Sequence, residues 1–283
     1  MLLGAHLSIS GGFDKALTNI HNIGGKSLQI FSSSPRNWGK LNISVEQINN
    51  FLKLKNKLQV NPVVFHASYL INLADTDRIG KLSVQTLTGE LRLASKMKIM
   101  GSIVHLGSYK NQLTDNKQQI TKKSVFNYLI RNIYEVLKNT PKSTLFIIEN
   151  AGNRKIGQTL EEIGIIIKEI NNPRLKVCLD TCHLFAAGYD FTTKEKLDKF
   201  LGKFDKLIGL NRLSVIHAND SKDDFGALRD RHDNIGEGKI GLEAFRTLLN
   251  HPDLRKLPFI IETPGFDGKG PDRKNLEILK SLI

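Results

Sequence analysis

The chain has 283 residues, 40% of them hydrophobic, and its 41 Lys and Arg against 28 Asp and Glu give a formal net charge of +13. This length suits either two small domains or one α/β barrel, for which about 250 residues is typical. The two cysteines are too few for a disulfide framework, and no apolar run approaches the ~18 residues of a membrane-spanning helix. Because no Pro/Gly/Ser-rich linker divides the chain, we expect one domain over residues 1–283, located in the cytoplasm without membrane contact.

The excess of positive charge favours a nucleic-acid partner, because a basic surface attracts phosphodiesters and speeds their encounter. A composition rich in Lys, Asn and Ile, with solvated helix faces such as residues 53–57, explains the same charge without such a partner. Charge alone therefore leaves both interpretations open.

Short apolar runs alternate with amphipathic segments along the whole chain. Buried parallel strands are typically continuous apolar runs, and we expect strands at 2–6, 27–31, 63–66, 103–105, 145–149, 177–180, 215–217 and 259–262. Helical spacing of apolar residues predicts helices at 13–23, 44–58, 77–100, 119–138, 159–171, 193–207 and 242–250, with a last one opened by Asp272. Eight strand-then-helix units predict a TIM (β/α)8 barrel.

One segment, residues 219–241, is polar and shows no period. Long irregular segments inside a compact domain are usually functional or disordered. Because this one contains Asp230 and His232, we expect it to be functional.

Six of the expected strands end in a metal-binding side chain, and the C-terminal ends of barrel strands meet at one mouth. With His183 after one strand and two residues from the long loop, the candidate ligands are His66, His105, Glu149, Asp180, His183, His217, Asp230, His232 and Glu262. Imidazole and carboxylate together suit Zn²⁺, Mn²⁺ or Fe²⁺ better than Ca²⁺ or Mg²⁺. Since one metal takes three or four protein ligands, this set predicts two or three metals at the C-terminal face of the barrel, with Glu149 placed to bridge two of them.

Clustered metals suit the hydrolysis of phosphodiesters, because they activate water and neutralise the charge of the phosphoryl oxygens. Combined with the basic surface, the cluster predicts phosphodiester hydrolysis on nucleic acid, with Glu149 as a catalytic residue.

Several stretches resemble the endonuclease IV family of apurinic/apyrimidinic (AP) endonucleases. They are LDTCHLFAAGYD at 179–190, HANDSK at 217–222 and DRHDNIGEG at 230–238, with GAHLS at 4–8 and IETPG at 261–265. The resemblance spans essentially the whole chain in order. It implies a three-zinc enzyme that cuts the phosphodiester 5′ to an abasic site in double-stranded DNA, for base excision repair.

The resemblance also assigns the ligands to three metals. His66, His105 and Glu149 would hold the first zinc; Glu149, Asp180, His217 and Glu262 the second; His183, Asp230 and His232 the third. A hydroxide between the first two metals would attack the phosphate, leaving a 3′-hydroxyl and a 5′-deoxyribose phosphate. Some members of the family also trim blocked 3′ ends.

Three residues match DNA-contacting positions of the family. Arg36 corresponds to a residue that enters the duplex from the minor groove, and Tyr69 and Leu70 to residues that fill the gap left by the extruded nucleotide. Such insertion repays part of the stacking energy that a flipped site costs. Packing of Trp38 and Tyr69 on the barrel rim is the alternative interpretation.

Two departures from the family pattern stand near the expected site. The family usually continues its fourth-strand ligand as His-Pro-Gly-Ser-His, whereas this chain has Leu106 and Tyr109 in place of the Pro and the second His. Ala227 stands where the family often has Ser. Neither departure removes a predicted ligand.

Other functions remain open at this stage. Sugar isomerases and epimerases of xylose-isomerase-like barrels share the architecture, but they need only one or two metals and have no use for the third ligand set. Amidohydrolases place His-x-His after the first strand, which His6-Leu7-Ser8 lacks. A non-catalytic DNA-binding protein with structural zinc would favour Cys-rich sites. We expect a monomer that acts on DNA, with Mn²⁺ or Fe²⁺ as alternatives to Zn²⁺.

Overall fold

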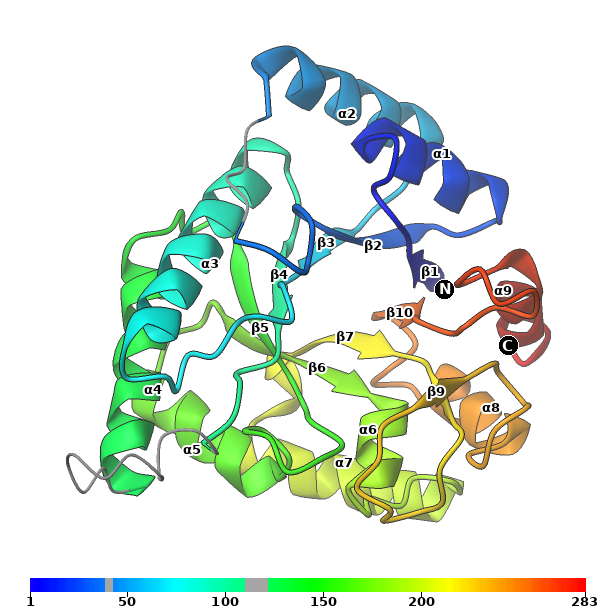
Figure 1. Ribbon diagram of the computed structural model, residues 1–283. Helices are drawn as coiled ribbons and strands as arrows, with labels where there is room; N and C mark the ends of the chain where they lie inside the picture. Colours follow the sequence, from blue (N-terminus) through cyan, green and yellow to red (C-terminus); the bar gives the residue numbers. More distant parts are fainter. Residues whose placement is uncertain (39–42, 110–121) are drawn as a thin grey trace.

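The fold is a closed barrel of parallel strands surrounded by helices (Figure 1). A computed structural model describes residues 1–38, 43–109 and 122–283. The eight barrel strands follow the order β1-β10-β7-β6-β5-β4-β3-β2, so each pairs with its sequence neighbours and the last closes on the first. The strands are β1 (Leu2–His6), β2 (Ser27–Phe31), β3 (Val63–His66), β4 (Gly101–Val104), β5 (Leu145–Glu149), β6 (Leu175–Asp180), β7 (Leu213–His217) and β10 (Pro258–Ile261).

Helices connect the strands and cover the outside of the barrel (Figure 1). They are α1 (Phe13–Asn22), α2 (Val45–Leu58), α3 (Arg78–Lys96), α4 (Lys122–Lys138), α5 (Leu160–Ile170), α6 (Thr181–Ala186), α7 (Lys194–Leu207), α8 (Leu242–Asn250) and α9 (Arg273–Ser281), with the 3₁₀ turn η1 (Leu210–Arg212). A capping box of Ser44 and Gln47 is present at the start of α2. None of the described helices is long and apolar enough to cross a membrane.

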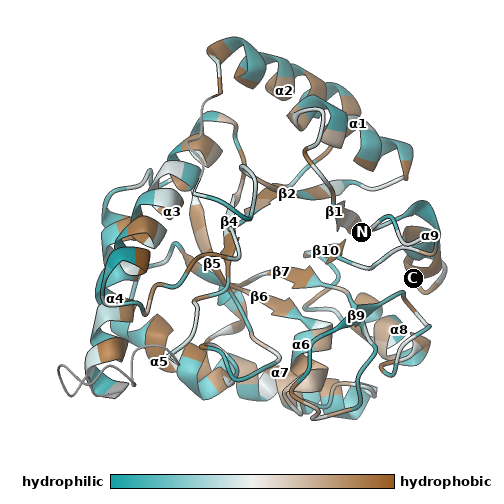
Figure 2. Ribbon diagram, in the orientation of Figure 1, coloured by the Kyte–Doolittle hydropathy of each residue, from teal (hydrophilic) through white to brown (hydrophobic). Residues whose placement is uncertain are grey.

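The hydrophobic core has two separate layers. The larger one lies between the barrel and its helices, whose apolar stripes face the strands (Figure 2). The smaller one fills the barrel interior and takes one residue from each of six strands: Val64, Ile103, Ile147, Cys178, Val215 and Ile260. Each stands two positions before a predicted metal ligand. Because side chains alternate between the two faces of a strand, each ligand therefore points into the barrel, directly above this inner layer.

The predicted TIM barrel is confirmed, and the differences from expectation lie in short elements and at the ends of longer ones. The segment 219–241 contains a two-stranded antiparallel pair, β8 (Asp220–Ser221) and β9 (His232–Asp233), where we expected no regular structure. Helix α6 was not expected, because six residues are too few to show helical spacing. Helix α3 ends at Lys96, four residues before the predicted end. The predicted start of α4 at residue 119 lies outside the described residues.

The inner layer yields a stability prediction. Replacing Ile147 by Ala should lower the free energy of unfolding by about 2–5 kcal/mol, because the side chain is fully buried. Urea titration followed by circular dichroism measures the change. Ile165→Ala, at a position that is 52% exposed on α5, is the matched control and should cost under about 0.5 kcal/mol. Equal costs at the two positions would contradict a packed inner layer.

Candidate metal centre

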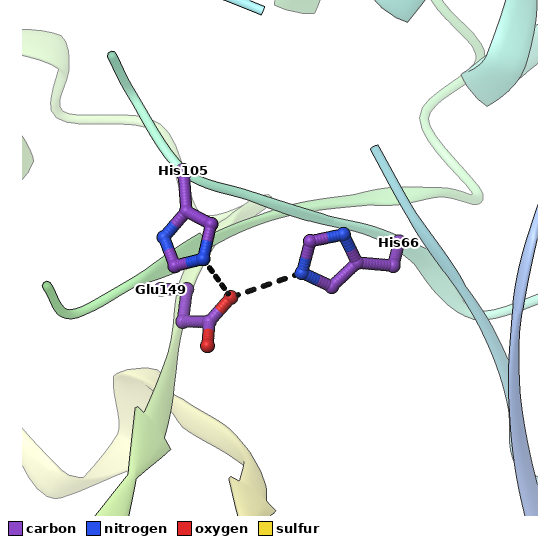
Figure 3. Close-up of side chains that lie close together, drawn as sticks. All are labelled: His66, His105 and Glu149. Carbon is purple, nitrogen blue, oxygen red and sulfur yellow. Dashed lines mark hydrogen bonds and ion pairs between the residues drawn. The ribbon is translucent and has the colours of Figure 1, made fainter. Parts of the chain in front are cut away.

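Glu149 is the hub of a cluster of histidines at the C-terminal end of the barrel. Its side chain is fully buried at the end of β5. The Nε2 atoms of His66 and His105 lie 3.1 and 3.2 Å from its Oε2 (Figure 3). On the other side, Nδ1 of His217 and of His183 lie 3.1 and 3.4 Å from its Oε1. The two carboxylate oxygens therefore face different histidine pairs, as a ligand bridging two metals would require.

The charges of the cluster support this arrangement. Burial raises the pKa of Glu149, but the charges of His105 and His217 and hydrogen bonds from His217 and His66 outweigh it and hold the pKa well below its ordinary value. For His105, burial dominates and lowers the pKa to about 4, although the charge of Glu149 acts in the opposite direction. An ionised carboxylate beside a neutral imidazole is the protonation state that metal ions bind.

A second group surrounds His217 at the end of β7. Its Nδ1 lies 3.7 Å from Oδ2 of Asp180 and 3.6 Å from Oε2 of Glu262, in addition to its contact with Glu149. Asp180 is the register partner of His217 in the barrel. Ligand atoms of these four residues lie within 4.8 Å of one another, as do those of His66, His105 and Glu149. The structure thus brings together the residues predicted for the first and second metals.

Hydrogen bonds to backbone carbonyls set the tautomer of three histidine rings. A carbonyl oxygen only accepts, so Nδ1–H of His66 donates to Ala67 O at 2.8 Å, and Nδ1–H of His183 to Asn150 O at 2.9 Å. His232 Nδ1 lies 3.3 Å from Glu262 O in the same way. In its neutral form, each ring then carries a lone pair on Nε2, which is the tautomer of a metal-binding histidine.

One orphaned atom supports a metal at this site. Nε2 of His232 is buried and has no hydrogen-bond partner in the described chain, and its nearest carboxylate oxygen is Oδ2 of Asp180 at 3.5 Å. A buried nitrogen without a partner is costly, and a metal ion would satisfy it. The donor set is the one that Zn²⁺, Mn²⁺ and Fe²⁺ prefer.

The predicted third set is only partly assembled. His183, Asp230 and His232 line the same cavity, and the rings of His183 and His232 are 5.5 Å apart. The atoms within 4.8 Å of one another are instead those of Asp180, Cys182 and His232. Cys182 is a weak competitor, because burial raises the pKa of its thiol and only the thiolate is a good ligand.

The loop that supplies Asp230 and His232 is held by buried carboxylates. Oδ2 of Asp220 accepts hydrogen bonds from the amides of Gly236 and Gly238 at 2.9 and 3.2 Å, and Oδ1 from that of Ile240 at 2.9 Å. Beside Asp230, Arg231 binds Asp223 through both Nε and Nη2, at 2.9 and 2.6 Å. The polar loop is therefore ordered by its own side chains.

Above the cluster is an open cavity of about 920 Å³. Arg36 and Tyr69, both predicted to contact DNA, line it, whereas Leu70 is not among the lining residues. Tyr69 is 68% exposed, although its ring also packs against that of Phe31, with 5.5 Å between the ring centroids. The loop after β2, which carries Arg36, is joined to the loop after β3, which carries Tyr69, because Ser68 Oγ donates to Pro35 O at 2.7 Å. Trp38, by contrast, packs against the core, as the rim-packing interpretation expected.

The structure explains one departure near the site. Leu106 is fully buried in the outer core, and Tyr109 packs against the same core and donates through its hydroxyl to Oε1 of Glu162 at 3.0 Å. Leu106 and Tyr109 thereby fix the turn after His105 to the core and to α5, in place of the Pro and the second His that the family usually has. Nothing in the structure explains Ala227.

Two positioning residues escaped the sequence analysis. Gln29 on β2 accepts from Nε2–H of His217 at 2.7 Å, and its amide also donates to Oε1 of Glu262. Asn219 donates to Oδ2 of Asp180 at 2.6 Å and accepts from the amide of Glu262 at 2.7 Å. Their only sequence signal is position, since Gln29 is a polar residue inside an apolar strand run and Asn219 follows a ligand by two residues.

Comparison with known proteins identifies the family. The family model described as "Xylose isomerase-like TIM barrel" matches residues 17–282. "Probable endonuclease 4" of Sulfurihydrogenibium sp. is 37% identical over 99% of both chains, and that of Thermosipho africanus is 37% identical over 99% of this chain and 98% of its own. The chain belongs to the endonuclease IV family.

Solved structures agree with this membership. The crystal structure of endonuclease IV from Thermus thermophilus superposes with a TM-score of 0.84 at 29% identity, covering 100% of this chain and 98% of that one. A D-tagatose 3-epimerase-like protein has a TM-score of 0.71 at 21% identity, covering 100% of this chain and 97% of its own. At that identity the epimerase shows a shared fold alone. The predicted membership in the endonuclease IV family is confirmed.

Gln29 yields a test of the histidine tautomer. Gln29→Met should weaken metal binding by about 10–100-fold, because the acceptor that fixes Nδ1 of His217 toward the carboxylates is lost. Competition with a chromophoric chelator measures the affinity. Gln158→Met, at a partly exposed position before α5, is the control and should leave it unchanged. Unchanged affinity in Gln29→Met would contradict the positioning role.

Gly152 yields a test of the third set. A Cβ at this position would lie 2.8 Å from His183 Cα and 2.9 Å from Asp230 Cβ. Gly152→Ala should therefore push α6 and the Asp230 loop apart and remove part of the bound metal, which elemental analysis measures. Gly202→Ala, where a Cβ meets nothing within 4 Å, is the control. An unchanged metal content in Gly152→Ala would contradict a metal held between α6 and the Asp230 loop.

Proposed function

We propose that this chain is a metal-dependent AP endonuclease that hydrolyses the phosphodiester 5′ to abasic sites in double-stranded DNA. The observation that carries the proposal is the hub at Glu149, where one buried carboxylate is contacted by four histidines from different strands and α6 beneath an open cavity. The products would be a 3′-hydroxyl and a 5′-deoxyribose phosphate. Trimming of blocked 3′ ends falls within the same chemistry.

The residues divide the work among three metal positions. His66, His105 and Glu149 would hold the first, Glu149, Asp180, His217 and Glu262 the second, and His183, Asp230 and His232 the third. Bound Zn²⁺ would supply an activated water and neutralise the charge of the phosphate. Gln29 and Asn219 hold the ligands in place from behind.

The rim would recognise the lesion. Arg36 and the exposed ring of Tyr69 line the same cavity, and the Tyr69 ring lies 6.3 Å from that of His66, centroid to centroid. A cation and an aromatic ring there suit insertion into a duplex that has lost a base, because stacking on the ring replaces part of the lost base stacking. We place Leu70 in the same group, behind Tyr69. The chain would act as one domain and as a monomer, in the cytoplasm and at the nucleoid.

Incision of a duplex with one abasic analogue tests the function. Cleavage should occur 5′ to the lesion, leave a 3′-hydroxyl end, and stop after incubation with phenanthroline. Incision that resists the chelator, or that ignores the lesion, would contradict the proposal.

Substitution of the hub tests the site. Glu149→Gln should reduce incision by at least about 100-fold, because the first and second metals lose the carboxylate that they share. The melting temperature should change little, since residues at the C-terminal ends of barrel strands serve the site. Glu243→Ala, at an exposed position on α8, is the control. Parallel loss of stability and activity in Glu149→Gln would indicate a structural metal.

A further inference from the structure

The loop between β5 and α5 carries two cations to the edge of the metal cavity. Arg154 and Lys155 are exposed, but the backbone around them is fixed. The amide of Lys155 donates to Asn153 O at 2.7 Å, and that of the buried Ile156 donates to Gly107 O at 3.1 Å. The position of Lys155 is therefore set by the barrel rather than by a free loop.

This loop joins two parts of the metal centre. Gly107 belongs to the turn just after His105, and Asn153 donates through its amide to Oδ2 of Asp230 at 2.8 Å. Lys155 lines the cavity together with His105, His183 and Asp230. The backbone at Lys155 is thus tied to the turn after His105 on one side and to Asp230 on the other.

Lys155 is also available for a ligand. None of the ion pairs found in the described part of the chain includes it, whereas Lys269, on another wall of the cavity, lies 3.5 Å from Asp267. Arg36, which lines the same cavity, follows β2, three strands from β5 around the barrel. A polyanion that crosses the cavity would therefore meet cations at both ends.

A second hollow continues from the cavity at Lys155. Its volume is about 440 Å³, and it is lined by Ser108, Asn153, Arg154, Lys155, Ala227 and Leu228. Lys155 belongs to both hollows, and Arg154 to the outer one only.

We propose that Lys155 binds a phosphate of the DNA backbone where the strand leaves the metal centre on the side of Asp230, and that Arg154 binds the next phosphate in the adjoining hollow. The proposal rests on the proposed function for the identity of the ligand. Lys binds phosphate as a point charge and Arg as a bidentate fork, so the two suit successive phosphates of one strand. This subsite would orient the incised strand without taking part in bond cleavage.

Charge-removing variants test the subsite. Lys155→Gln should raise the KM for the abasic duplex about tenfold with little change in kcat, because a contact to a flanking phosphate is made in the ground state and the transition state alike. The slope of log KM against log salt should fall by about 0.9. Lys155→Arg should restore most of the loss. Lys168→Gln, which removes the same charge from the far end of α5, is the control and should behave like the wild type.

Neutral methylphosphonate linkages identify the phosphate. Each duplex carries one such linkage at a different position around the lesion. At one position the linkage should raise the KM of the wild type but cause no further rise in the KM of Lys155→Gln. Additive losses at every linkage, or equal KM values for Lys155→Gln and Lys168→Gln, would overturn the proposal.

A titration with inorganic phosphate separates this proposal from the function. Calorimetry on the metal-loaded protein should show weaker phosphate binding in Lys155→Gln than in Lys168→Gln, even if the wild type does not incise abasic DNA. Weaker binding without incision would contradict the AP endonuclease function and leave the phosphate subsite standing. Equal phosphate binding would overturn the subsite itself.

Discussion

The alternation of side chains along a strand, inside a barrel that closes, is the constraint on which the site depends. Six strands place an apolar residue in the interior and a His, Asp or Glu two positions later. Because the period is two, the second side chain points the same way as the first. Ile147 beneath Glu149 and Val215 beneath His217 show the arrangement. A shift of one residue in any strand would turn its ligand outward to the helices and break the inner layer at the same time, so the packing that stabilises the barrel also aims the ligands.

Burying several carboxylates and histidines together is costly unless they satisfy one another. Here Glu149 accepts contacts from four rings, and Glu262 is held by His6 and by the Gln29 amide. Burial raises the pKa of Glu262, but the charge of His217 and the hydrogen bond from His6 outweigh it and keep the pKa well below its usual range. The protein thereby keeps the ligands ionised and aligned. Because the centre is already ordered, metal and DNA can bind without an additional free-energy cost for arranging its side chains.

The sequence predicted those features of the fold and the site that follow from the periodicity of apolar residues along the chain. Apolar runs ending in His66 or Glu149 marked both the strands and the ligands, because strand burial and barrel closure are read directly from such runs. Gln29 was invisible to the same reasoning, since a single polar residue inside an apolar run has no period of its own. The approach of Cys182 to Asp180 depends on how α6 turns after β6, and the position of Lys155 depends on a hydrogen bond to Gly107. Contacts between distant loops leave no local trace in a single sequence.

Anomalous diffraction from crystals of the metal-loaded protein tests the central claim most directly, because it locates metals without assuming a reaction. The account predicts one peak between His66, His105 and Glu149 and a second between Glu149, Asp180, His217 and Glu262. A third is predicted beside His183, Asp230 and His232. Peaks that lie away from Glu149, or no peak above the inner apolar layer, would contradict the account.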